Sequence, residues 1–440
     1  MSAEAPREHV TPYDRCAWSD TQIEQWLACG EHAEELGAYF GGSEYRALCA
    51  LARRAARTAV TEAAPTVLIV PGIMGSQLGL ARAAPLPNDI VWIDPVDIQL
   101  GRLAALRLPG PAPVVALGVV LFSYLRLKLQ LRARGLAVQM HDYDWRLPVE
   151  ELGRALARRV RAFAPAPVAL VAHSMGGLVA RAALSQPRLA HVQQVVLLGT
   201  PNEGSFAVVQ ALRGTYAVVR KVARLDGASS AEQLTREVFS SFPSLYDMLP
   251  RNAGLDLFDP GQWPASGPQP RAPLLAAARA THAALAPADA RFTVVAGTGQ
   301  ETVTAVRRRG DEFVYTLTRR GDGTVPTVSA QLEGARNLYV RVAHSDLTRD
   351  ATVAAAVADL LRRGRTTRLA QRGGSASRAR AQVSDRQLRR THIQKVDWAA
   401  LTPQERRAFL ENLNEPPRLR LRVPAARRRR QRQRHGPHAR

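Results

Sequence analysis

Residues 168–184, VALVAHSMGGLVARAAL, constrain the fold more than any other stretch of the chain. The apolar opening predicts a buried strand, the small residues around Ser174 predict a tight turn, and the remainder predicts a helix. A serine at the apex of a strand–turn–helix is the layout of a nucleophile elbow, where the crowded backbone requires small neighbours. Gly176 meets that requirement after Ser174, whereas Ala172 stands before it, where the usual pattern has glycine. A serine hydroxyl is a weak nucleophile, so the chain must also supply a base, an acid and an oxyanion site.

The chain around this stretch alternates between strand and helix patterns. Apolar runs predict strands at residues 66–70, 137–141, 195–199, 292–296, 312–318 and 338–342. Helical patterns separate or follow them at residues 119–134, 152–163 and 351–361. This alternation predicts an α/β fold with a mostly parallel sheet flanked by helices. Ligands of such sheets collect at the carboxyl ends of the strands.

Three chemically suited side chains follow the ends of predicted strands. Ser174, Asp322 and His344 occur in that chain order, which is the order of the α/β-hydrolase arrangement. His344 would take the proton from Ser174 and return it to the leaving group. Asp322 would hold the imidazole tautomer and stabilise the imidazolium. The sequence therefore predicts a Ser174–Asp322–His344 triad on an α/β-hydrolase fold.

The acid of this triad has rivals in Asp311, Asp346 and Asp350. Two flanking glycines place Asp322 in a tight, exposed turn, which favours it, and an ordinary β-turn aspartate is the alternative.

The base has rivals in His282, His141 and His173. His282 lies in a long insertion and His141 comes before the relevant strands. His173 neighbours the nucleophile, but its side chain should point away from the direction of attack, so we expect a structural role for it.

The oxyanion site is predicted from two backbone N–H groups. The N–H of Met175 directly follows the nucleophile, and the glycine-rich turn at residues 71–76 follows the first strand. Within that turn Ile73 is the expected second donor, and a plain strand-to-loop turn is the alternative reading. No His/Asp/Glu cluster has the spacing of metal ligands, so we expect neither a metal nor a cofactor.

The pattern divides the chain into three parts. Residues 1–62 read as a small helical extension, and residues 65–365 as the α/β-hydrolase domain. Residues 206–290 contain no clear central strand, and an insertion of this length suits a helical cap over a pocket. Residues 366–440 read as a basic, largely disordered tail with one amphipathic helix at residues 397–413.

The charge of the chain is concentrated in that tail. The formal net charge is +22, and residues 366–440 hold 20 basic and 5 acidic side chains. Such a segment could bind anionic lipid headgroups, or it could simply be a solvated chain. Nucleic acid is a less favoured partner, because no aromatic residues are interleaved for base stacking. We therefore expect a possible anionic membrane surface, and no nucleic acid, as partner.

The cysteines and the apolar runs bear on location. Cys16, Cys29 and Cys49 are odd in number and lack metal spacing, which favours free thiols in a reducing compartment; a Cys16–Cys29 or Cys29–Cys49 bridge is the alternative. Because the first 30 residues are polar and acidic, we expect no secretory signal peptide there. The longest apolar run, residues 114–125, is too short to cross a bilayer and predicts a buried or interfacial helix. We expect a cytoplasmic protein, peripheral at a membrane if the tail binds one. Its Ala- and Arg-rich composition is typical of a high-GC bacterial coding sequence.

Six motifs in order resemble one family. The series PGIMGSQL, DYDWR, AHSMGGLVAR, LGTPNEGS, GDGTVP and AHSDL is similar to the lecithin:cholesterol acyltransferase-like family of α/β-hydrolases, over about residues 65–362. The resemblance implies the triad named above, an oxyanion donor from the turn after Pro71-Gly72, and acyl-ester chemistry on lipids, by hydrolysis or by transfer to an alcohol. It also implies that Trp145 and Arg146 frame the pocket. The lid disulfide of the family's secreted members is absent, since no cysteine follows Cys49.

Two classes of function are consistent with these patterns. The first is a serine acyl hydrolase or O-acyltransferase on lipid esters, with a phospholipid-type acyl donor. A carboxylesterase or triacylglycerol lipase without phospholipid specificity is its close variant. The second is a non-catalytic binding protein that uses its basic tail. The order of the triad residues favours the first.

Overall fold

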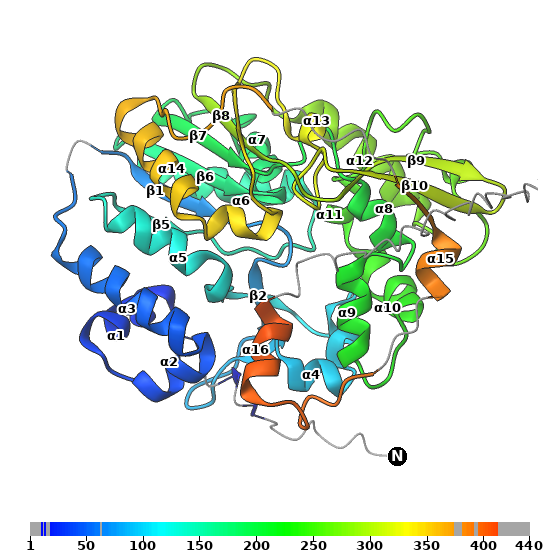
Figure 1. Ribbon diagram of the computed structural model, residues 1–440, viewed down its shortest axis with the longest axis horizontal. Helices are drawn as coiled ribbons and strands as arrows, with labels where there is room; N and C mark the ends of the chain where they lie inside the picture. Colours follow the sequence, from blue (N-terminus) through cyan, green and yellow to red (C-terminus); the bar gives the residue numbers. More distant parts are fainter. Residues whose placement is uncertain are drawn as a thin grey trace, which may run out of the picture.

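A six-stranded parallel sheet forms the centre of the protein (Figure 1). The computed structural model describes residues 10–11, 13–14, 18–61, 64–373, 381–390 and 395–411. Across the sheet the strands are β11 (Arg336–Val340), β8 (Phe292–Gly297), β7 (Val192–Leu198), β6 (Val168–His173), β1 (Thr66–Val70) and β5 (Val138–Met140). Every neighbouring pair is parallel, which confirms the predicted sheet.

The direction in which strands are added to the sheet reverses at β1. The chain runs from β1 to β5 on one side and then returns to β6 on the other side of β1. In parallel α/β sheets, the carboxyl ends of strands at such a reversal are where ligands bind. The turn after β1 and the serine turn after β6 both follow the carboxyl ends of strands at this reversal.

The composition of β1 explains why helices cover both faces of the sheet. Val67 and Ile69 belong to one hydrophobic cluster, whereas Leu68 and Val70 belong to another. All four are fully buried. Successive side chains of a strand point to opposite faces, so an apolar run without polar positions needs cover on both sides.

Two helices pack on each face. The first cluster contains side chains of α6 (Val149–Arg161) and α7 (Met175–Leu184). The second contains side chains of α5 (Leu121–Arg132) and α14 (Ala351–Arg363).

The N-terminal part is helical, as its pattern predicted. It consists of α1 (Asp20–Cys29), α2 (Ala33–Phe40) and α3 (Gly42–Arg57), whose apolar side chains join the second cluster. Lys128 of α5 is buried and pairs with Asp20 at 2.7 Å and with Glu24 at 3.0 Å. Cys29 and Cys49 are free thiols, and Cys16 lies outside the described residues.

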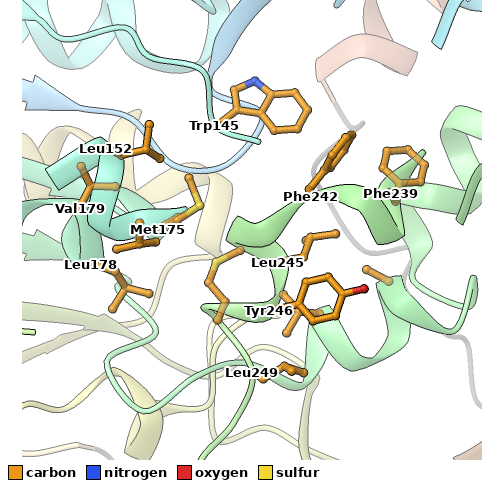
Figure 2. Packing of buried hydrophobic residues seen from close by; sticks show 14 of the residues in the cluster. Trp145, Leu152, Met175, Leu178, Val179, Phe239, Phe242, Leu245, Tyr246 and Leu249 are labelled. Atoms are coloured by element: carbon orange, nitrogen blue, oxygen red, sulfur yellow. The ribbon is translucent and has the colours of Figure 1, made fainter. Parts of the chain in front are cut away.

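The insertion at residues 206–290 folds as a set of helices beside the sheet (Figure 1). They are α8 (Phe206–Leu212), α9 (Ala217–Leu225), α10 (Ala231–Glu237), α11 (Pro243–Tyr246) and α12 (Ala272–Ala284), with short 3-10 turns at Phe239–Ser241 and Pro260–Gln262. Figure 2 shows side chains of α6 and α7 on one side of a hydrophobic cluster and side chains of the insertion, including Phe242 and Leu249, on the other. The rings of Trp145 and Phe242 lie 5.6 Å apart. The insertion thus shares its core with the helix that begins at the elbow.

A small antiparallel sheet replaces a helix that the sequence predicted. β2 (Ser76–Leu80) pairs with β3 (Asp89–Trp92) and with β4 (Val115–Val119), near the short helix α4 (Pro95–Gln99) and the 3-10 turn Arg102–Leu106. The prediction of one helix over residues 114–125 was wrong, because β4 takes its first half and α5 begins only at Leu121. The run is uniformly apolar, so its period could not distinguish the two.

A second antiparallel sheet includes a strand from the C-terminal part of the chain. β9 (Thr302–Arg309) and β10 (Glu312–Thr318) form a hairpin, and β12 (Ala381–Ser384) pairs with β10. The helices α15 (Asp385–Arg390) and α16 (Pro403–Glu411) follow β12. Residues 381–390 therefore lie on the body of the protein, although the sequence favoured a disordered tail there.

A buried ion pair between Arg213 and Asp385 holds residues 381–390 on the body of the protein. Asp385 accepts a hydrogen bond from Nε of Arg213 at 2.9 Å and another from the Tyr315 hydroxyl at 2.7 Å, and Asp385 and Arg213 are fully buried. The predicted helix at 397–413 corresponds to α16, and residues 412–440 lie outside the described residues. None of the helices in the described ranges has both the length and the apolar composition needed to cross a bilayer.

Candidate active site

Ser174 occupies a sharp turn between β6 and α7. Its backbone has φ 54° and ψ −128°, a positive φ that costs energy for a residue with a side chain. The turn is held by a hydrogen bond from the Ser174 N–H to the Leu198 carbonyl at 2.9 Å. A Cβ on Gly176 would lie 2.4 Å from the Pro71 carbonyl, so only glycine fits there. This geometry is that of the nucleophile elbow.

The predicted base and acid lie beside Ser174. The Ser174 Oγ is 2.9 Å from Nε2 of His344, and Nδ1 of His344 is 2.7 Å from Oδ2 of Asp322. Oδ1 of Asp322 accepts hydrogen bonds from the N–H groups of Thr324 at 2.9 Å and Val325 at 2.7 Å. The structure thus brings together the three residues that the sequence singled out, with the acid 1% exposed and oriented by its own loop.

A glycine beneath the acid and base permits their close packing. Gly199, at the end of β7, has φ +59°, and a Cβ there would lie 3.1 Å from both Oδ2 of Asp322 and Nδ1 of His344. The backbone joins the two as well, because the His344 N–H donates to the Asp322 carbonyl at 2.9 Å. The imidazole and the carboxylate are therefore fixed relative to each other through both side chain and main chain.

The turn after β1 lies directly against the serine. A Cβ on Gly72 would lie 2.8 Å from the Ser174 Cβ. The Gly72 N–H is already engaged, since it donates to the Tyr124 hydroxyl at 2.8 Å. No acceptor in the described part of the chain takes the N–H of Ile73 or of Met175. These two N–H groups, the predicted oxyanion donors, are therefore available to a ligand.

The DYDWR segment supports that turn. The Tyr143 hydroxyl donates to the Pro71 carbonyl, and Nε1 of Trp145 donates to the Ser76 carbonyl at 2.9 Å. Arg146 pairs with Asp144 at 2.6 Å and is buried. These contacts hold the turn after β1 in place.

The rival acids have other roles or lie elsewhere. Asp350 caps the N-terminus of α14 by accepting from the N–H groups of Thr352 and Val353. Asp311 accepts from the Ser266 N–H at the tip of the β9–β10 hairpin. Asp346 lies two residues beyond His344, in the 3-10 turn His344–Thr348.

The rival bases are held neutral by burial. Burial, with the charge of Arg159 adding to it, lowers the pKa of His141 to about 4. Burial likewise lowers the pKa of His282, in the insertion, to about 4. His173 is buried, and this burial, followed by the charge of the nearby His344, lowers its pKa to about 3.

Sequence reasoning missed Tyr124. This residue of α5 contacts both the first turn of the site and His173, which is 3.0 Å from its hydroxyl. Tyr124 lies in an apolar helical run with no motif around it, so nothing in the sequence marked it. Among the described residues no group of three or more His, Cys, Asp or Glu side chains is arranged to hold a metal ion.

Comparison with known proteins agrees with this architecture. Residues 155–241, which include the elbow, match the model of the PGAP1-like alpha/beta domain. The parallel sheet, its flanking helices and the elbow together make an α/β-hydrolase fold. This match does not test the resemblance to the lecithin:cholesterol acyltransferase-like family, which stays a prediction. No curated protein matches the chain.

Two solved structures are similar to this chain at low sequence identity. One is the lipase BlEst2 of Bacillus licheniformis in its mature form, 16% identical over 69% of this chain and 94% of that chain, with a TM-score of 0.37. The other is a chain of the Tle4–Tli4 complex, 15% identical over 68% of this chain and 98% of that chain, with a TM-score of 0.44.

Proposed function

We propose that the protein is a serine-dependent acyl hydrolase or O-acyltransferase that acts on lipid esters. The observation that carries the proposal is the position of His344, whose two ring nitrogens lie 2.9 Å from the Ser174 Oγ and 2.7 Å from the Asp322 Oδ2. A nucleophile, a base and an orienting acid in hydrogen-bond contact are what acyl transfer through a serine requires.

The proposed reaction assigns one step to each of these groups. As the Ser174 Oγ attacks the ester carbonyl, Nε2 of His344 takes its proton and Asp322 stabilises the resulting imidazolium. The negatively charged oxygen of the tetrahedral intermediate would accept hydrogen bonds from the N–H groups of Ile73 and Met175. His344 then returns the proton to the departing alkoxide, leaving an acyl-serine. Water or an alcohol, deprotonated by His344, then attacks the acyl carbon; the bond to the Ser174 Oγ breaks, His344 returns the proton to that oxygen, and an acid or a new ester is released.

The expected acyl donor is a phospholipid-type ester. The six motifs support this choice, and the helical insertion beside the elbow suits an apolar substrate. A panel of phospholipids, triacylglycerols and short soluble esters, each with and without an added alcohol, would test it. Release of fatty acid from phospholipid is the expected result. Turnover of the short esters and triacylglycerols alone would instead indicate a carboxylesterase or lipase without phospholipid specificity. Formation of a new ester when the alcohol is present would indicate acyl transfer.

Covalent labelling tests the nucleophile itself. A fluorophosphonate probe should label the wild-type protein and leave Ser174→Ala unlabelled. Ser185→Ala is a matched control, because Ser185 is the C-cap of the same helix and should label like wild type. Absence of wild-type labelling, or equal labelling of Ser174→Ala, would contradict the enzyme proposal and favour a non-catalytic binding protein.

We also propose that the basic residues 412–440 bring the enzyme to an anionic membrane surface on the cytoplasmic side. Basic side chains near such a surface contribute about 1 kcal/mol each. A truncation after Glu411 removes this segment and keeps the described residues 381–390 and 395–411, among which β12 pairs with β10 and Nζ of Lys395 donates to the Ala223 carbonyl at 2.8 Å. In sedimentation with vesicles, full-length protein should bind those with anionic lipid and the truncated protein should not. Equal binding of both would reject the proposal.

A further inference from the structure

A chain of three hydrogen bonds joins the two halves of the candidate site. The Gly72 N–H lies 2.8 Å from the Tyr124 hydroxyl, and that hydroxyl lies 3.0 Å from Nδ1 of His173. On the other side of the ring, Nε2 of His173 lies 3.0 Å from the carbonyl oxygen of His344. The chain therefore runs from the turn that carries Ile73 to the main chain of the base.

The direction of every proton in this chain follows from chemistry. A carbonyl oxygen only accepts, so Nε2 of His173 must carry a hydrogen. Burial lowers the pKa of His173 to about 3, so the ring is neutral and its Nδ1 accepts. The Tyr124 hydroxyl then donates to Nδ1, and its oxygen accepts from the Gly72 N–H. The Tyr124 hydroxyl and the His173 ring each donate one hydrogen bond and accept one, so no two donors and no two acceptors face each other.

The structure makes room for this arrangement. Tyr124 is 3% exposed, and a Cβ on Gly75 would lie 2.9 Å from its hydroxyl oxygen. The rings of Tyr124 and His173 lie 5.8 Å apart, edge to face. The hydroxyl therefore has one position, between the turn and the imidazole.

Each end of the chain fixes a part of the reaction geometry. At one end, fixing the Gly72 peptide orients the next N–H, that of Ile73, which is one of the two free donors of the site. At the other end, the His344 carbonyl is fixed by His173 while its N–H is fixed by the Asp322 carbonyl at 2.9 Å. The main chain of the base is thus held on both sides. An error of about 1 Å in such alignments can cost on the order of 100-fold in rate.

We infer that Tyr124 and His173 are positioning residues that couple the oxyanion turn to the main chain of His344. The inference rests on the proposed function of Ser174, Asp322 and His344. His173 therefore does more than fill space in the core. Its Nδ1 contacts the Tyr124 hydroxyl, and its Nε2 contacts the His344 carbonyl.

Two amide substitutions separate the two ends of the chain. His173→Asn puts an amide oxygen near the place of Nδ1, so it keeps the acceptor for Tyr124 and loses the bond to His344. His173→Gln puts an amide N–H near the place of Nε2, so it keeps the donor to His344 and loses the acceptor. Tyr124→Phe removes the central hydroxyl and leaves the Gly72 N–H without a partner.

The first measurement is steady-state turnover of a soluble ester. We expect Tyr124→Phe and His173→Gln each to lower kcat by about tenfold or more with KM within twofold, because only the transition state needs the oxyanion alignment. The double variant Tyr124→Phe/His173→Gln should lose little more than the worse single variant, since both break the same link. Independent, multiplying losses would contradict a single chain.

Two control variants separate positioning from loss of stability. Tyr246→Phe removes another buried hydroxyl, which accepts from the Arg271 N–H at 2.9 Å and donates to the Ser240 carbonyl at 2.7 Å. His191→Gln removes an imidazole that contacts the Val160 carbonyl at 2.9 Å, at the far end of β7. Both should lower Tm about as much as the matching site variants and leave kcat unchanged. Equal kcat losses in the controls would overturn the inference.

A 1H NMR measurement tests the His344 end of the hydrogen-bond chain and needs no turnover. The proton between Nδ1 of His344 and Oδ2 of Asp322, which lie 2.7 Å apart, should give a downfield 1H NMR resonance in the resting protein. It should broaden or shift in His173→Asn and stay near its wild-type position in His173→Gln. Unchanged spectra in both variants would overturn the coupling to His344. A wild-type protein without labelling or turnover would instead count against the proposed function, while the NMR comparison would still decide the coupling.

Discussion

The buried Arg213–Asp385 pair offers the sharpest test of how the C-terminal segment is held. Arg213 lies at the end of α8, and its guanidinium donates to Asp385 and to the carbonyls of Pro264, Ser266 and Pro268. Asp385→Asn preserves shape but removes the charge. It also allows an amide N–H to face Nε of Arg213, where both groups are donors.

The magnitude follows from the burial of both partners. Removing one partner of a fully buried pair leaves an uncompensated charge and typically costs about 3–5 kcal/mol. Residues 381–390 can detach without unfolding the sheet, so the cost should appear as local opening of β12 and α15. A tenfold change in population corresponds to about 1.4 kcal/mol, so the open population should rise on the order of 10²–10³-fold.

Hydrogen–deuterium exchange measures that population directly. Peptides covering residues 381–390 and α8 should lose protection by this factor in Asp385→Asn, while peptides of β6 should not change. Arg386→Gln is the control, because Arg386 is exposed and lies 3.9 Å from Glu312, a contact expected to contribute less than about 1 kcal/mol. Wild-type protection of residues 381–390 in Asp385→Asn would refute the reasoning.

Three further outcomes follow from the described contacts. Asp322→Asn should lower kcat by about 10⁴-fold with little change in Tm, because the amide favours the wrong tautomer of His344; a loss below tenfold in ester turnover would show that the acid is elsewhere. Gly72→Ala should abolish fluorophosphonate labelling, since its Cβ would lie 2.8 Å from the Ser174 Cβ, and normal labelling would contradict the geometry. Burial raises the pKa of Asp247 to about 6 although it accepts from the Val149 N–H, so the folded protein binds this proton more tightly and loses stability as pH rises from about 4 through 6. Asp247→Asn should therefore raise Tm at pH 8 and not at pH 4 in a thermal-shift series, and the reverse order would refute the sign.

The sequence predicted the sheet and the residues at its edge for a local reason. A run such as residues 67–70 is apolar at every position, which marks a strand buried on both faces. Ser174, Asp322 and His344 each follow such a strand or the hairpin after it, and parallel strands bring their carboxyl ends together. Linear order and periodicity were therefore enough to nominate the three residues that the structure brings into contact.

Where periodicity carried no information, prediction failed. The uniformly apolar residues 114–125 read as one helix and form a strand followed by a helix start. The polar residues 381–390 read as disordered and form an edge strand and a helix, because their stability comes from a partner and not from their own pattern. The hairpin of β9 and β10 that receives them was only half predicted.

The sequence by itself determined the strand–turn–helix around Ser174 and the order of the candidate triad, because both depend on neighbouring residues and on chain order. Only the tertiary structure decided which groups surround them. Tyr124 meets Gly72 across 52 positions, His173 meets His344 across 171, and Arg213 meets Asp385 across 172. Periodicity indicates that a side chain is buried, but the folded backbone alone determines which polar group lies within hydrogen-bond distance of it.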